Sequence, residues 1–145
     1  MLISPGKDPD GDEFDLSGVV VDRFLQSGVI VNRCSSPISL NDVIGSPRGI
    51  EKSEEGIKLT SEVANPYYIA MFDAMVESGK LHPEFGYALS GVITGREGGV
   101  IRCFDLKSVA LLPLKDISDP RCVVRVVQDS QGRVVKRSES GDKKG

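Results

Sequence analysis

The chain has 145 residues, of which 39% are apolar, and carries 18 basic and 21 acidic side chains, a formal charge of −3. This length is enough to bury one core, so we expect a single domain. Such a weak net charge gives no indication of a nucleic-acid-binding surface. The chain has no run of 18 apolar residues, so we predict no membrane span. Three cysteines without a Cys-x-x-Cys spacing indicate neither a disulfide framework nor a zinc site, so we expect core thiols in a reducing compartment.

Charge is distributed unevenly along the chain. Residues 7–15 (KDPDGDEFD) hold five acids and one lysine, whereas residues 133–145 (RVVKRSESGDKKG) hold five bases and two acids. We interpret residues 1–16 as an acidic N-terminal arm, 17–137 as one domain and 138–145 as a basic polar tail. The two ends are either solvated or dock on oppositely charged neighbours in an assembly.

Two motifs that could hold ligands fail on inspection. The alternating aspartates of residues 8–19 are similar to a calcium loop, but Glu13 stands where a glycine is needed and Val19 where a bidentate glutamate is needed. Gly95, Gly98 and Gly99 lie in a turn between predicted strands, whereas a phosphate-binding loop leads into a helix. We therefore expect no metal and no cofactor.

The first 63 residues predict four strands. β-Branched runs at 17–25 and 27–34, separated by a Gln-Ser-Gly step, indicate a hairpin, and a second pair follows at 43–52 and 55–63. In the last of these runs, apolar and polar side chains alternate, which predicts one buried and one wet face. This spacing favours an antiparallel sheet or barrel.

The period then changes to that of a helix. Asn65 is placed to cap it and Pro66 to open it, so we predict one principal helix over residues 66–79. Its apolar stripe indicates packing against the sheet and consists of Tyr68, Phe72, Met75 and Val76. Further strands are predicted at 86–95, 99–114 and 121–129, with a short one at 133–137. The fold class is mainly β (α+β), with seven or eight strands.

Ser90 is the serine of an otherwise apolar predicted strand, GYALSGVITG (86–95), and His82 is the only histidine. A hydrolase could use His82 as the base for Ser90. However, Pro83 and Gly86 place His82 in a connecting loop, and an exposed loop histidine is the interpretation that we favour.

These stretches together resemble a known family. The order is VIGSPRGIEKSEEGIKLTSEV, a helix ending in ESGKL, then ALSGVITG, a turn, and FDLKSVALLP. It is similar to the prohead (capsid-maturation) proteases of tailed phages, distant relatives of the herpesvirus assemblins, over about residues 17–128. The resemblance implies a mostly antiparallel β-barrel of about seven strands with the helix packed against it. It also places the family's nucleophilic serine at Ser90.

The chain departs from the family at the other catalytic positions. The family's histidine base belongs in the segment that matches SSPISLNDVIG (35–45), which contains none; its position falls near Ile38 or Ser39. The acidic residue of the later strand falls on Ser108, and the residue two beyond is Ala110. A serine hydroxyl without a base is a weak nucleophile, and removing the base typically costs on the order of 10⁶ in turnover. We therefore expect no catalytic residue and a vestigial Ser90.

The expected function follows from the resemblance and from the missing catalytic histidine and acidic residue. We expect a non-enzymatic structural component of a phage capsid, either a decoration (cement) protein or an auxiliary head protein, made in the host cytoplasm and located in the virion. Its partner would be the major capsid protein, with itself or other head proteins as further partners, and without membrane or specific nucleic-acid binding. Two alternatives stay open: an active maturation serine endopeptidase with Ser90 as nucleophile and His82 as base, and a barrel with an unrelated binding role.

Overall fold

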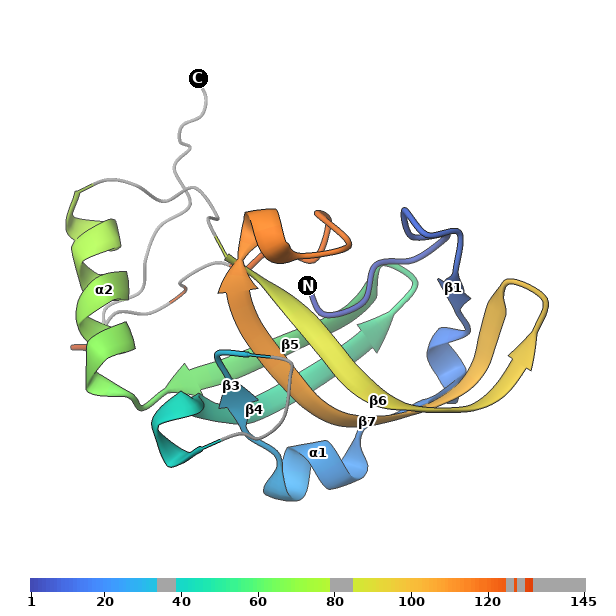
Figure 1. Cartoon of the computed structure of the whole chain (residues 1–145), viewed down its shortest axis with the longest axis horizontal. Helices are drawn as coiled ribbons and strands as arrows, with labels where there is room; N and C mark the ends of the chain where they lie inside the picture. Colours follow the sequence, from blue (N-terminus) through green and yellow to red (C-terminus); the bar gives the residue numbers. More distant parts are fainter. Residues whose placement is uncertain (34–38, 79–84, 125–126, 128–129, 132–145) are drawn as a thin grey trace.

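The computed structural model describes residues 1–33, 39–78, 85–124, 127 and 130–131. Strand β7 (Val100–Pro113) is the centre of the sheet (Figure 1). Along one edge it pairs with the antiparallel strand β6 (Phe85–Glu97). Along the other edge it pairs with three short parallel strands in succession, which are β1 (Glu13–Phe14), β2 (Val19–Val20) and β3 (Ile30–Val31). The chain from β1 to β3 therefore follows the length of β7.

The second predicted strand pair is confirmed as the hairpin of β4 (Val43–Ser53) and β5 (Gly56–Val63), and β3 joins it to the rest of the sheet. Ile57 and Leu59 are buried while Lys58 and Thr60 are exposed, as the alternation predicted. The turn uses Gly56 at a φ of 121°, a backbone conformation that glycine adopts without strain. The long pair β6 and β7 is confirmed in the same way, with Gly98 at a φ of 58° in its turn.

The predicted hairpin over residues 17–34 is wrong. Over the described residues 17–33, only β2 and β3 are strands, and both pair with β7. The helix α1 (Asp22–Ser27) lies between them. Phe24 on α1 is fully buried, and burying a phenylalanine outweighs the small preference of β-branched residues for a strand. Two parallel strands beside one partner also need a connection longer than a tight turn, which α1 supplies.

The principal helix is confirmed as α2 (Pro66–Glu77). The Asn65 side chain accepts the backbone N–H of Tyr67, and Pro66 occupies the first turn, as expected. Phe72 is buried and meets the ring of Phe85 on β6 edge to face, so α2 packs against the sheet through the predicted stripe. Gly79, the predicted end of the helix, lies outside the described residues.

Residues 1–16 differ from the separate acidic arm that we expected. Leu2 and Ile3 are only 1% and 3% exposed and belong to the core. Their backbone N–H groups donate to the Ile57 carbonyl, and the Ile57 N–H donates to the Ile3 carbonyl. This segment therefore lies antiparallel beside β5, as a further short strand would. The tail at 138–145 and the predicted strand at 133–137 lie outside the described part of the chain.

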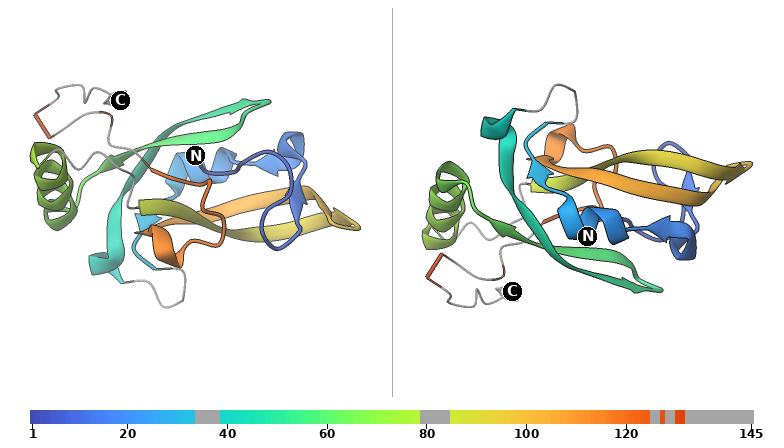
Figure 2. Two further views of the ribbon diagram at one scale, coloured as in Figure 1. Left: turned by 90° about the horizontal axis from the view of Figure 1, so that it is seen from above. Right: turned by 90° about the horizontal axis from the view of Figure 1, so that it is seen from below.

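The sheet is mixed and does not close into the expected barrel. Three strand pairings are parallel and three antiparallel, and no pairing joins β5 to β6 among the described residues. Figure 2 shows the N-terminal segment between the β4–β5 hairpin and the β6–β7 pair. Of the strand predicted at 121–129, the structure describes residues 121–124 and 127. Among these, Val123 forms an isolated bridge with Gly86, flanked by bonds from Tyr87 N–H to the Cys122 carbonyl and from Val124 N–H to the Phe85 carbonyl.

Candidate functional site

Ser90 lies in the middle of β6, and its register partner on β7 is Ser108. Directly opposed residues of an antiparallel pair present their side chains on the same face, so the two hydroxyl groups are neighbours. The adjacent pair, Leu89 and Val109, packs into the core, and strand alternation therefore directs the two serines to the opposite face. Both serines are half-buried.

The Ser90 hydroxyl forms no hydrogen bond with any residue that the structure describes. Ser108, on which the resemblance would place an acidic residue, is neutral, and Ala110 beyond it is buried beside Val31 of β3. On the same strand, the Asp105 carboxylate is 2.9 Å from the Lys107 ammonium group, an ion pair of its own. None of the described side chains forms a hydrogen bond to Ser90 through which it could take the hydroxyl proton.

The resemblance would place a histidine base near Ile38 or Ser39. The structure describes Ser39, while Ile38 and His82 lie outside the described residues. Ser39 caps the short 3₁₀ helix Leu40–Asp42: its backbone N–H and its hydroxyl donate to the Asp42 carboxylate at 2.9 and 3.2 Å. The backbone hydrogen bond is the main reason that the pKa of Asp42 is lowered from its usual value. Ser39 therefore has a structural role at the start of β4.

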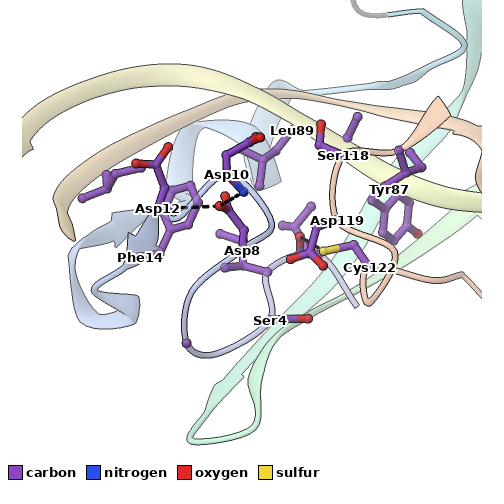
Figure 3. Close-up of a pocket in the computed structure, with 16 residues that line it drawn as sticks. Ser4, Asp8, Asp10, Asp12, Phe14, Tyr87, Leu89, Ser118, Asp119 and Cys122 are labelled. Atoms are coloured by element: carbon purple, nitrogen blue, oxygen red, sulfur yellow. Dashed lines mark hydrogen bonds between the residues drawn. The ribbon is translucent and has the colours of Figure 1, made fainter. Parts of the chain in front are cut away.

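A cavity of about 210 Å³ lies on the other face, beside β6, at the point where its bonds to residues 122–124 stop (Figure 3). Side chains of the N-terminal segment, β6, β7 and the stretch after β7 line it. Its apolar wall consists of Leu2, Ile3, Phe14, Tyr87, Leu89, Ile101 and Ile117. Ser90 is not among the lining residues, so the cavity is not a substrate pocket for that serine.

The mouth of the cavity is acidic, with Asp8, Asp10, Asp12 and Asp119 in its lining (Figure 3). Asp8 Oδ1 accepts the backbone N–H groups of Asp10 and Asp12, both at 2.9 Å, which gathers three carboxylates in one turn. Asp12 is paired with Arg96 at 2.9 Å. Within the described residues, no group of three or more acidic, cysteine or histidine side chains is arranged to hold a metal ion.

Arg121 joins the N-terminal segment to the stretch after β7. Its guanidinium donates to the carbonyls of Pro5 and Lys7, each at 2.9 Å, and to both carboxylate oxygens of Asp119. Partial burial of Asp119 favours its neutral form, but the hydrogen bonds from Arg121 outweigh this and lower the pKa of Asp119. The Asp119 hydrogen bond in turn raises the pKa of Arg121, where the Asp8 charge also contributes. The pair therefore stays charged and holds one wall of the cavity.

Cys122 is buried beside the same wall, as expected of a core thiol, and its Sγ donates to the Leu2 carbonyl at 3.3 Å. Burial raises the pKa of the Cys122 thiol, which keeps it neutral and unreactive. The expectation fails for Cys103, which is exposed on β7, and Cys34 lies outside the described residues.

The sequence indicated the acidic head but not the cavity that it faces. The cavity requires contacts between residues that are far apart in the chain, such as those of Arg121 with Pro5 and Lys7. One signal was present: the apolar pair Leu2–Ile3 ahead of the acidic run marks a segment that belongs in a core.

No known protein family, no curated protein and no solved structure matches this chain. In the described part of the chain, neither helix is long and apolar enough to cross a bilayer.

Proposed function

We propose that this chain is a non-enzymatic structural component of a phage capsid, a decoration (cement) or auxiliary head protein on an inactive prohead-protease-like fold. The observation that carries the proposal is the pairing of Ser90 with Ser108. A serine protease needs a base beside its nucleophile and a third group that orients the base. The residue that the resemblance assigns to the third group is Ser108, a second hydroxyl directly opposite Ser90. A serine hydroxyl carries no negative charge with which to stabilise the protonated form of a base.

Binding is the function that such a fold can retain. A domain that keeps its architecture without its chemistry acts through its surface, and a capsid offers many copies of one partner. Weak contacts repeated over a lattice give high avidity without a large interface in each copy. The major capsid protein is the proposed partner, and the protein's place is the virion.

The alternative, an active maturation endopeptidase, gains no support from the described residues. Ser90 is half-buried, is absent from the lining of the cavity and has no base beside it in the described part of the chain.

The composition of purified mature particles tests this proposal. We expect the intact chain in a fixed, high ratio to the major capsid protein, and the same ratio when particles are grown with the Ser90→Ala variant. Particles that lack the chain, or Ser90→Ala particles that stop before maturation with uncleaved head proteins, would overturn the structural role.

A further inference from the structure

The outer edge of β6 has no backbone partner beyond Tyr87 in the part of the chain that the structure describes. The Tyr87 N–H donates to the Cys122 carbonyl, and two residues further on the Leu89 N–H and C=O point to the same side of the strand. Among the described residues, no backbone group pairs with this edge from Leu89 to the end of β6. The stretch from Ala88 to Thr94 carries no charged residue and no proline, the features by which proteins usually block an edge strand. An extended segment of another chain can therefore pair with it.

The acidic cavity begins at the same point, since Tyr87, Ala88 and Leu89 form its β6 wall. Four carboxylates at the mouth meet two guanidinium groups, because Arg96 pairs with Asp12 while Arg121 pairs with Asp119 and also feels the charge of Asp8. Asp10 forms no ion pair with any described residue. The mouth thus keeps an excess of negative charge above an apolar wall (Figure 3).

We propose that β6 and this cavity together dock an extended segment of a partner protein that carries a lysine or arginine. The segment pairs with the open edge of β6 from Leu89 onward and places its basic side chain in the cavity. The aliphatic stem then lies against Phe14 and Leu89 while its cationic end meets the carboxylates of Asp8 and Asp10. This inference rests on the proposed function in one respect, that the chain works by binding another protein.

The size of the cavity favours a single side chain. Sites for small-molecule ligands and cofactors typically enclose about 300–1,000 Å³. The value of about 210 Å³ is below that range. An apolar wall under a ring of carboxylates suits a long side chain with a charged end better than a bare cation, which needs oxygen ligands on several sides.

Synthetic peptides test the proposal without knowledge of the natural partner. The probe is a capped heptapeptide of alternating threonine and valine with one central lysine, and its match has norleucine in place of lysine. We expect the lysine peptide to bind the full chain about tenfold more tightly at 50 mM NaCl by fluorescence anisotropy, and the advantage to shrink at 500 mM. Peptides N-methylated on one edge or on the other test backbone pairing, and we expect one of the two to lose binding.

Protein variants locate the site. Asp8→Asn with Asp10→Asn removes two charges but keeps an oxygen that can accept the backbone N–H groups of the turn. We expect it to bind both peptides equally. The matched control is Asp22→Asn with Glu77→Gln, which removes the same charge outside the cavity lining, from α1 and α2. It should keep the preference for lysine, and circular dichroism should show both variants folded.

Three results would overturn the inference: equal binding of the lysine and norleucine peptides, equal loss of preference in both charge variants, or full binding by both N-methylated peptides. Failure here is distinguishable from failure of the proposed function. A chain that is abundant in particles but does not discriminate between the peptides has lost only the docking site. A chain that binds the lysine peptide but is missing from particles has lost only the capsid role.

Discussion

The Tyr87 hydroxyl on β6 is hydrogen bonded to Ser61 Oγ on β5, although no backbone pairing joins these two strands. Tyr87 is buried, and this burial raises the pKa of its hydroxyl despite the opposing effect of Ser61. The bond therefore links β5 and β6, the two strands between which the sheet stays open. It ties the β4–β5 hairpin to the β6–β7 pair near the cavity.

Tyr87→Phe removes this bond and leaves the Ser61 hydroxyl half-buried without its partner. We expect the free energy of unfolding to fall by about 1 kcal/mol, the usual net contribution of such a bond, as measured by urea denaturation. Tyr67→Phe is the control, because Tyr67 on α2 is 72% exposed and should tolerate the change. Equal free energies of unfolding in the two variants would show that the contact between β5 and β6 does not depend on this bond.

Asp119→Asn tests the clamp that Arg121 forms. The pKa of Asp119 is lower in the folded protein than its ordinary value of 3.8, so the folded state favours the carboxylate. The stability that this provides is complete above about pH 4 and is lost as the pH falls through the folded pKa. We expect the variant to be less stable by about 1 kcal/mol at pH 7 and the difference to disappear towards pH 2. A difference that grows on acidification would contradict the assignment.

Two glycines of β4 should respond in opposite ways to alanine. A Cβ at Gly45 would lie 1.9 Å from the Glu62 carbonyl oxygen of β5, whereas a Cβ at Gly49 would meet nothing within 4 Å. We expect Gly45→Ala to lower the free energy of unfolding by about 3 kcal/mol and Gly49→Ala to raise it by about 0.5 kcal/mol. Thermal unfolding of both variants checks the β4–β5 register. Similar effects at the two positions would place the strands in a different register.

Ile3→Ala tests whether the N-terminal residues belong to the core. Loss of this buried side chain should cost about 2–4 kcal/mol, while Val20→Ala, at a half-exposed position on β2, should cost less than about 1 kcal/mol. Guanidinium unfolding of the two variants beside the native chain gives the comparison. A loss of less than about 1 kcal/mol in the free energy of unfolding of Ile3→Ala would indicate that residues 1–16 are an arm outside the core.

The parts of the fold predicted from the sequence are those with local signals. The alternation of apolar and polar residues over 55–63 predicted β5, and Asn65 with Pro66 predicted the start of α2. The hairpin at 17–34 failed because Val19 and Ile30 pair with β7, more than 75 residues away, rather than with each other. No local pattern reports such a partner.

In the candidate site too, features with a local sequence signal could be predicted and features that depend on long-range contacts could not. The position of Ser90 within a strand was predicted and is confirmed, because the GYALSGVITG pattern is local. Its partner Ser108 could be named from the resemblance, but their direct opposition depends on the register of β6 with β7. The cavity depends on Arg121 reaching the carbonyl of Pro5, a contact between opposite ends of the chain.

The reactivity of Ser90 tests the central claim most directly. An activated serine reacts with diisopropyl fluorophosphate, whereas a serine without a base does not. We predict that the native chain and the Ser90→Ala variant each keep their own intact mass, without an adduct, after incubation with this reagent, while trypsin in a parallel tube is fully labelled. A covalent adduct on the native chain that is absent from Ser90→Ala would contradict the account and make the protein an enzyme.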